Sequence, residues 1–240
     1  MIERDQPKIF GESVIAKVSS RDDGNMRFGR GDDQQTLENR LRFLKEAGID
    51  PSHTTLVQVT YDEDDFARYK IVDETHKALG MHKPVSDLVA DALVTTEPGH
   101  ALFLPLADCV GVVLYDTQRK ILMVSHVGRH SAEIEGAKKS VIYLSDNFGT
   151  DPKTIQAWLS PAVGKATYPL HKLDGISLHE AINHQLTAAG IRPENIETSH
   201  VDTAHDENYF SHSRFLAGER PFDGRFAIAA MMSARSEAAS

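Results

Sequence analysis

The stretch "PLADCVGVVLYDTQRKILMVSHVGRH", Pro105 to His130, holds two apolar runs joined by the short polar segment "TQRK". Both runs are rich in β-branched and aliphatic residues, and four polar residues are enough for a hairpin connection. We therefore expect two neighbouring strands in the middle of the protein. Cys109, the only cysteine, precedes the first run, and His126 ends the second. Neighbouring strands would bring these two side chains to the same sheet edge.

The rest of the sequence switches between the helical and the strand period of hydrophobic residues, which is typical of a mixed α/β protein. Helices are expected over residues 34–48, 131–149 and 177–190. Asp33 is expected to cap the first helix and Gly48 to end it. Further strands are expected over residues 13–20, 54–59, 91–96, 101–107, 154–159, 196–201 and 225–232. Because strands cluster first and then alternate irregularly with helices, the sequence predicts an α/β fold of the α+β type, with helices covering mixed β-sheets.

The chain is expected to form a single domain. Its 240 residues are 40% hydrophobic, which is enough to bury a full core. The core is predicted to span about residues 13–232, with a frayed tail over residues 233–240. The acidic run from Asp62 to Asp65 lacks the regular ligand spacing of a cation site, so we expect a solvated loop there.

Composition excludes several classes of protein. The formal net charge of −9 argues against a broad nucleic-acid surface, and no apolar run approaches the roughly 20 residues of a membrane helix. The N-terminal segment lacks the basic and apolar blocks of a signal peptide, and a lone cysteine forms no internal disulfide. We expect a cytoplasmic protein with a small-molecule partner, no nucleic acid and no membrane. The oligomeric state is left open.

Sulfur and imidazole together suit two kinds of chemistry. Cys109 and His126 are soft ligands of the kind that zinc or copper binds, and they are also a thiol and a base for nucleophilic catalysis. A lone cysteine is also common as a small buried hydrophobic residue. The two residues alone leave all three interpretations open.

Longer motifs connect the chain to a known family. The segment "ADALVTTEPGHALFLPLADCVGVVLYD", followed by "SHVG" and then "AWLSPAVGKATYPL", resembles the laccase-domain family. The segments "SSRDDGN", "GDDQQTLENR" and "NYFSHSR", the last followed by Gly224 and Arg225, extend the resemblance over roughly residues 13–232. Members of this family are described as polyphenol oxidases and as purine nucleoside phosphorylases.

The resemblance implies both a fold and a reaction. The family has a single layered α/β/β/α domain and a zinc or copper site built from one cysteine and two histidines. Its members are reported to phosphorolyse or deaminate purine nucleosides, some to oxidise phenols, and others to edit peptidoglycan precursors. A small polar substrate of the nucleoside kind is therefore expected here.

The family motifs map onto this chain with one ligand missing. The Ala-Asp-Cys motif corresponds to Ala107, Asp108 and Cys109, and the first histidine of His-Ala-Gly-Trp-Arg-Gly corresponds to His126. The third ligand comes from a Gln-Val-His-Gly segment, which reads "QVTY" here and places Thr60 at the histidine position. A threonine hydroxyl is a poor zinc ligand compared with imidazole.

Other positions depart from the family as well. Arg129 and His130 replace its Trp-Arg pair, and His212 replaces its C-terminal tyrosine. His130 lies four residues after His126, and a helical backbone there would put both on one face, so we predict His130 as the third metal ligand, with His212 as the other candidate.

The predicted site combines residue chemistry with these matches. The predicted catalytic residues are Cys109, His126 and Asp108, and the predicted metal ligands are Cys109, His126 and His130, with zinc as the ion and copper as its alternative. Arg21 matches a family arginine and is suited to holding a phosphate or carboxylate. The predicted substrate-binding residues are Arg21, Thr60, His130, Ser211, His212 and Arg214.

Three functions fit these residues. The first is a metal-assisted enzyme that phosphorolyses or deaminates a purine nucleoside or a similar small polar substrate. The second is a metal-free cysteine hydrolase in which His126 activates Cys109. The third is a non-catalytic protein of the same family that binds a small molecule. Polyphenol oxidation ranks behind these.

Overall fold

Two mixed β-sheets lie face to face in the structure, a computed structural model that describes residues 1–61, 65–83 and 88–234. The first sheet has the order β1-β10-β5-β2, with the bounds Val14–Val18, Phe226–Met232, Ala101–Leu106 and Thr54–Leu56. The second has the order β3-β4-β7-β6-β8-β9, with the bounds Tyr69–Ile71, Ala92–Thr95, Ile121–Val127, Val110–Asp116, Ile155–Leu159 and Ile196–Thr198. Both sheets combine parallel and antiparallel pairs.

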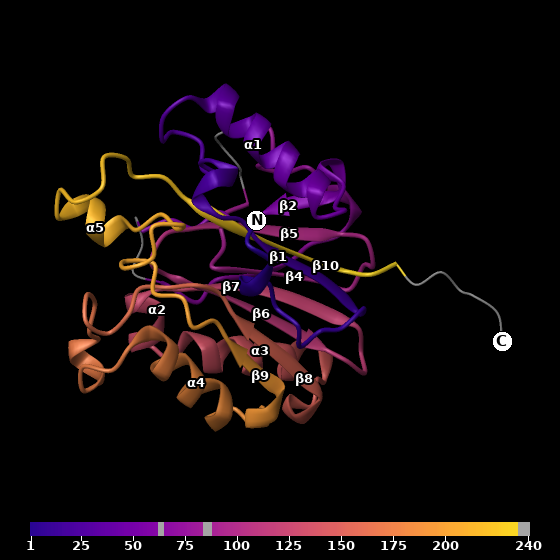
Figure 1. Ribbon diagram of the computed structural model, residues 1–240. Helices are drawn as coiled ribbons and strands as arrows, with labels where there is room; N and C mark the ends of the chain where they lie inside the picture. Colours follow the sequence, from indigo (N-terminus) through magenta and orange to yellow (C-terminus); the bar gives the residue numbers. More distant parts are fainter. Residues whose placement is uncertain (62–64, 84–87, 235–240) are drawn as a thin grey trace.

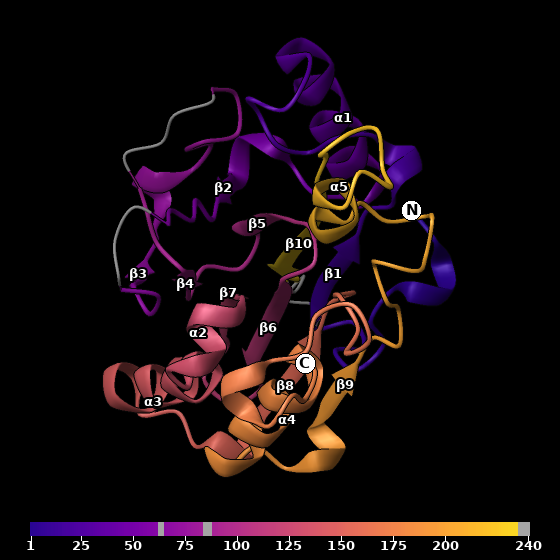
Figure 2. The ribbon, with the colours of Figure 1, turned by 90° about the vertical axis from the view of Figure 1, so that its left-hand side faces the viewer.

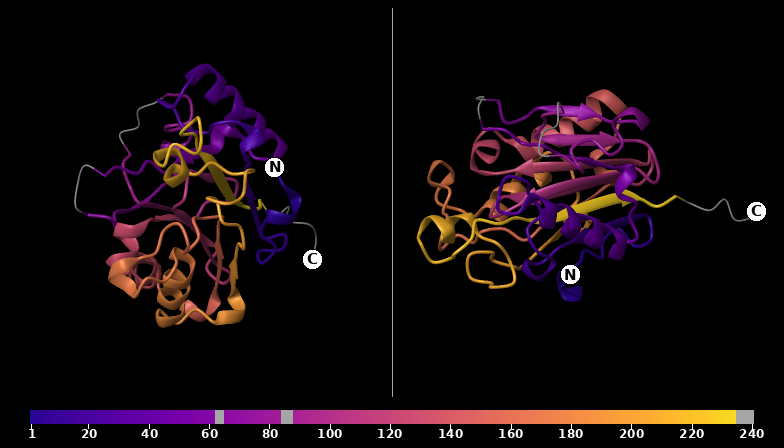
Figure 3. Two further views of the ribbon diagram at one scale, coloured as in Figure 1. Left: turned by 60° about the vertical axis from the view of Figure 1, so that its left-hand side comes forward. Right: turned by 90° about the horizontal axis from the view of Figure 1, so that it is seen from above.

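Helices cover the outer faces of both sheets (Figure 1). The first sheet is covered by α1 (Asp33–Glu46), and the second by α2 (Arg129–Glu133), α3 (Gly136–Phe148) and α4 (Leu178–Ala188). Figure 3 shows α1, in indigo, and α4, in orange, on opposite sides of the sheets. The layers follow the order α/β/β/α, so the predicted fold class is confirmed.

Shorter elements complete the chain. One further helix, α5 (His212–Leu216), lies at the same end of the sheets as α2 (Figure 2). Short 3-10 turns lie at Glu3–Asp5, Arg21–Asp23, Pro51–His53, Glu74–His76, Pro152–Thr154, His171–Leu173 and Pro193–Asn195. The short strand β3 and the helix α5 carry too little periodicity to be predicted from the sequence.

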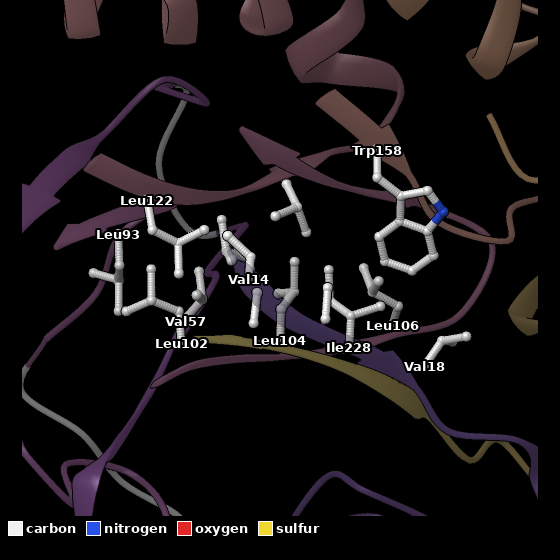
Figure 4. Close-up of a cluster of buried hydrophobic side chains, with 14 of the residues drawn as sticks. Val14, Val18, Val57, Leu93, Leu102, Leu104, Leu106, Leu122, Trp158 and Ile228 are labelled. Atoms are coloured by element: carbon white, nitrogen blue, oxygen red, sulfur yellow. The ribbon is translucent and has the colours of Figure 1, made fainter. Parts of the chain in front are cut away.

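The main core lies between the two sheets. Trp158 of β8 is 1% exposed, and its indole points across the interface toward Leu106 of β5 and Ile228 of β10 (Figure 4). Leu104 and Leu122 belong to the same cluster and come from opposite sheets. This burial of aliphatic and aromatic surface from both sheets holds the two layers together.

The strand β10 is buried on both faces. Phe226, Ile228 and Ala230 pack into the core between the sheets, while Ala227 and Ala229 face the cluster formed with α1. The same strand lies between β1 and β5, with antiparallel pairing on both sides. Burial from all directions explains why its sequence is an uninterrupted apolar run instead of an alternating one.

The hairpin predicted from the sequence is confirmed. The strands β6 and β7 pair antiparallel, with Gly111 opposite His126. Lys120 closes the turn with a φ of 56°. Gly128, which follows β7, starts the passage into α2.

Two helix predictions need correction. The helix expected over residues 131–149 is two helices, which are separated at Glu135 with a φ of 61°. The chain folds back so tightly there that a Cβ on Gly136 would lie 2.8 Å from the Ser131 carbonyl oxygen. The N-cap of α1 is Asp32, which accepts from two amides of the first turn, and not Asp33. The predicted end of α1 at Gly48 is confirmed by its φ of 73°.

The buried face of α1 is more polar than its apolar spacing indicates. Arg40 is 1% exposed and donates from Nε to the Met26 carbonyl over 2.7 Å and from Nη1 to the Gly80 carbonyl over 2.9 Å. Its guanidinium also lies 4.2 Å from the ring centroid of Phe28. These contacts hold the loop that carries Arg27 against the first sheet.

Two predictions fall mainly on residues outside those described. Of the acidic run predicted as a solvated loop, only Asp65 is described, and it is exposed. Of the predicted frayed tail, only residues 233 and 234 are described. In the described part of the chain, no helix is long and apolar enough to cross a bilayer.

Replacing Trp158 by alanine tests the role of the core between the sheets. We expect Trp158→Ala to lower the free energy of unfolding by about 3–5 kcal/mol, because the cavity left between two sheets collapses only partly. The measurement is urea denaturation followed by circular dichroism. Leu216, which is 70% exposed, provides the control, and Leu216→Ala is expected to change stability by less than about 0.5 kcal/mol. Equal losses in both variants would contradict this account of the core.

Candidate active site

Cys109 lies where the chain passes from the first sheet to the second. The preceding residue, Asp108, has a φ of 75°, a left-handed conformation that aspartate tolerates better than most residues. Its buried carboxylate accepts from the Thr203 hydroxyl over 2.8 Å and from the Ser213 amide over 2.6 Å. Its carbonyl accepts from the Val163 amide over 3.0 Å. These bonds fix the turn and thereby the direction of the Cys109 side chain.

The structure brings Cys109 and His126 together. A Cβ built on Gly128 would lie 2.9 Å from Cys109 Sγ and 3.4 Å from His126 Cε1. The sulfur and the imidazole therefore border the same small space. Only glycine at position 128 leaves that space free, which explains the Gly in the "SHVG" segment.

The pair opens into a cavity of about 660 Å³, a size suited to a nucleoside. Of the predicted site residues, Thr60, Cys109, His126, His130 and His212 line this central cavity.

Four predicted site residues lie outside the lining of the central cavity. Asp108 precedes Cys109 in the chain, and its carboxylate accepts hydrogen bonds from Thr203 and from the Ser213 amide. Ser211 accepts from the Arg214 amide at the start of α5, and Arg214 forms an ion pair with Glu219. Arg21 belongs to a 3-10 turn, where its amide donates to the Asn208 carbonyl. The catalytic role of Asp108 and the substrate contacts of Arg21, Ser211 and Arg214 stay predictions.

Tyr61, the neighbour of Thr60, reaches the Cys109–His126 pair. Although 56% of Tyr61 is exposed, its hydroxyl lies 3.4 Å from His126 Nε2 and forms a hydrogen bond with the Cys109 side chain. The carbonyl of Thr60 accepts from Arg68 over 3.1 Å. The family match points to Thr60, whereas no sequence motif marks the next residue in "QVTY", Tyr61, whose side chain contacts the pair.

The two histidines considered as third ligands have other partners. The ring of His130 stacks on Phe66, with centroids 4.7 Å apart and planes 16° from parallel. His212 Nδ1 lies 2.9 Å from an oxygen of Asp223. Across the described ranges, no three Cys, His, Asp or Glu side chains form a group that could hold a metal ion.

Arginines line one wall of the central cavity. Arg27, Arg30 and Arg225, here called the arginine cluster, lie near the carboxylate of Asp223. Arg30 and Arg225 bind Asp223 at 2.5 and 2.6 Å. Burial, followed by the charges of Arg225 and Arg30, lowers the pKa of Arg27. Among the described residues, three cations face one carboxylate, which His212 also contacts, so their net charge at this wall is positive. No sequence motif indicates this cluster, because residues far apart in the chain form it.

The central pair is uncharged at neutral pH. Burial raises the pKa of Cys109 to about 11, and the Asp108 charge adds to the effect. Burial also lowers the pKa of His126 to about 4, because its effect and that of Arg27 exceed the opposing effect of Asp91. A protonated thiol beside a neutral imidazole differs from the thiolate–imidazolium pair of cysteine hydrolases. Among the three functions considered, these protonation states favour the cysteine hydrolase least.

Comparison with known proteins identifies the family. The family model described as multi-copper polyphenol oxidoreductase laccase matches residues 16–173 and 170–233. The chain belongs to this family. The resemblance inferred from the sequence motifs is thereby confirmed.

Relatives in this laccase family have nucleoside-processing names. The chain is 28% identical over 222 residues to a protein named adenosine deaminase RL5, from an unknown prokaryotic organism, covering 81% of this chain and 83% of that protein. It is 27% identical over 205 residues to a purine nucleoside phosphorylase of Corynebacterium glutamicum, covering 77% and 78%.

Solved structures show the same fold. The hypothetical protein YfiH of Bacillus licheniformis superposes with a TM-score of 0.83 at 23% identity, covering 92% of this chain and 93% of that one. YlmD of Geobacillus stearothermophilus gives a TM-score of 0.83 at 20% identity, covering 95% and 94%. At these identities the likeness concerns the fold alone.

The metal expected from the laccase family does not fit the donors in the described part of the chain. Cys109 and His126 supply two ligands, whereas a catalytic zinc needs three protein ligands and an open position. The motif comparison predicts Thr60 at the position of the third, and His130 and His212 contact Phe66 and Asp223. Zinc or copper binding stays a prediction from the family.

A substitution at Asp108 tests the turn that aims Cys109. We expect Asp108→Ala to cost about 3 kcal/mol of stability, because it removes two hydrogen bonds to a buried carboxylate, each worth roughly 1.5–3 kcal/mol. Asp108→Asn is expected to cost less, since asparagine tolerates the same backbone conformation and still accepts hydrogen bonds. Urea denaturation measures both. The exposed Asp146→Ala on α3 is the control, and a loss in this variant equal to that of Asp108→Ala would refute the assignment.

Acidification tests the neutral state of His126. The pKa of His126 is about 4 in the folded chain, against its ordinary value of 6.5 when unfolded. Between these pH values the unfolded chain binds more protons than the folded chain. The contribution of neutral His126 to the free energy of unfolding is therefore complete above pH 6.5 and is lost as the pH falls toward 4. His126→Gln should therefore lose less stability than the wild type over this range, by up to about 1.4 kcal/mol per pH unit. Identical pH slopes in urea denaturation would show that His126 is not held neutral.

Proposed function

We propose that this protein is an enzyme that phosphorolyses a purine nucleoside or a closely similar small polar substrate. The observation that carries the proposal is the position of the arginine cluster, which lines the same cavity as Cys109 and His126. Phosphorolysis requires a phosphate ion beside a reactive centre, whereas deamination by water does not. The name of the Corynebacterium relative supports this reaction, and that of adenosine deaminase RL5 supports the same class of substrate.

The arginine cluster has the charge needed to bind phosphate. The guanidinium of Arg27 makes no hydrogen bond or ion pair with the residues described, although it lines the cavity. Arg225 is held in place by Asp223 and by the Gly224 carbonyl, so its position is fixed before any ligand arrives. A guanidinium offers a planar fork of donors that matches phosphate oxygens.

Aromatic groups line the same cavity and suit a purine. Phe66, stacked on His130, borders the cavity together with Phe28 and Tyr168. Aromatic side chains bind a base through its π-face and through apolar contact. The base is therefore expected on the side of Phe66, with phosphate at the arginine cluster and the sugar between them.

The proposed reaction balances in bonds, electrons and protons. A phosphate oxygen attacks C1′ of the sugar while the bond from C1′ to N9 breaks, and the electron pair of that bond leaves with the base. The phosphate loses one proton and the base gains one. The proton can pass from phosphate to the leaving base directly or through solvent, because His126, with a pKa of about 4, is too weak a base to hold it at pH 7. Arg27 and Arg225 stabilise the negative charge of the attacking group.

Changing Arg27 tests the phosphate subsite. We expect Arg27→Gln to raise the KM for phosphate at least about tenfold in inosine or adenosine phosphorolysis, because losing one charge-assisted hydrogen bond costs roughly 1.5–3 kcal/mol. The KM for the nucleoside should change less. The exposed Arg192→Gln, which is outside the cavity lining, is the control. Release of the base, sugar phosphate and ammonia is measured with and without phosphate.

The same assay distinguishes the alternatives. Ammonia released without phosphate would replace phosphorolysis by deamination. No product from any nucleoside, combined with nucleoside binding in calorimetry, would indicate the non-catalytic binding protein and end the enzyme proposal.

A further inference from the structure

The centre of the cavity contains a third group that the family resemblance does not provide. The Tyr61 hydroxyl contacts both His126 Nε2, at 3.4 Å, and the Cys109 side chain. The rings of Tyr61 and His126 meet edge to face, with centroids 6.2 Å apart. Two groups that would be metal ligands in this family thus share a phenol as their common neighbour.

We propose that this centre works without a metal ion, and that the Tyr61 hydroxyl replaces the ion as the group joining Cys109 to His126. The proposal concerns the same site as the proposed function, but it is decided by metal content and therefore does not depend on turnover. It assigns Tyr61 as a positioning residue for the two side chains.

The protons of the three groups fit together. The phenol hydroxyl donates to the Cys109 sulfur, and the phenol oxygen can accept from His126 Nε2 when that nitrogen carries the ring proton. This arrangement joins the three side chains through hydrogen bonds without an ion between them. A metal ion would have to remove the thiol proton and displace the phenol from the imidazole nitrogen.

The charges around the centre also disfavour a divalent cation. The arginine cluster is on the cavity wall, and its described carboxylate partner, Asp223, is already shared. The two described carboxylates whose charges act on His126 and Cys109 are engaged as well. Asp91 forms an ion pair with Arg68 at 2.8 Å, and Asp108 accepts from Thr203 and from the Ser213 amide. The described charges thus favour an anion in this cavity over a cation.

Metal content tests the proposal directly. The full chain is produced without added metal, dialysed against zinc and then against buffer, and analysed by mass spectrometry for bound metal. We expect well under one zinc per chain for the wild type and for Tyr61→Phe. The double change Thr60→His with Tyr61→Gly restores the family's segment, and it should bind zinc at least about tenfold more tightly, as expected when a missing ligand is supplied.

A second readout reports on the hydrogen bonds. Tyr61→Phe should change the alkylation rate of Cys109 and the NMR shifts of the His126 ring, whereas Tyr143→Phe should change neither. Tyr143 is a matched control because it lies on α3 against Tyr69, outside the cavity lining. Circular dichroism verifies that each variant is folded.

Two results of these experiments would overturn the metal-free proposal. About one tightly held metal per wild-type chain, lost in Cys109→Ala or in Tyr61→Phe, would overturn the proposal and make Tyr61 a ligand or its neighbour. A folded double variant that binds no more zinc than the wild type would also overturn it, because Thr60 and Tyr61 would then not be the cause of exclusion. If the double variant does not fold, the metal content of the wild type and the response of Tyr61→Phe decide.

Discussion

The architecture depends on the carboxylate of Asp108. The chain leaves β5 of one sheet and enters β6 of the other within three residues, and Asp108 makes this passage in a left-handed conformation. Its oxygens hold Thr203 and the start of α5, so the crossing is tied to loops from the far end of the sequence. One buried acid therefore fixes the crossing between the two layers and the direction of Cys109. A residue outside the cavity lining can thus influence the geometry of the centre.

The central cavity separates two electrostatic tasks. Cys109, His126 and Tyr61 form an uncharged group at neutral pH, while the arginine cluster supplies positive charge on the wall. Keeping the central groups neutral avoids burying charges side by side, which would be costly in this environment. Keeping the cations on the wall leaves them available to an anion that enters from solvent. An anionic co-substrate and a neutral nucleoside suit this division of the cavity.

Much of the fold could be predicted because it depends on local periodicity. The hairpin of β6 and β7, the end of α1 at Gly48 and the apolar strand β10 are each set by residues adjacent in sequence. Cys109 and His126 were found by their places at strand ends. Tyr61 and Arg27 were not, because their roles depend on how distant segments meet. Whether Thr60 or Tyr61 reaches the centre is decided by the backbone path after β2, which no local pattern records.

The place of β10 has a consequence for how the chain is made. This strand lies between β1 and β5 and is buried on both faces, yet it follows both of these neighbours in the sequence and is synthesised after them. Until residues 226–232 emerge, the first sheet has a gap at its middle and the apolar faces around it have no partner. The nascent protein must therefore keep these surfaces from aggregating until β10 has been made, a period in which chaperones would be expected to act.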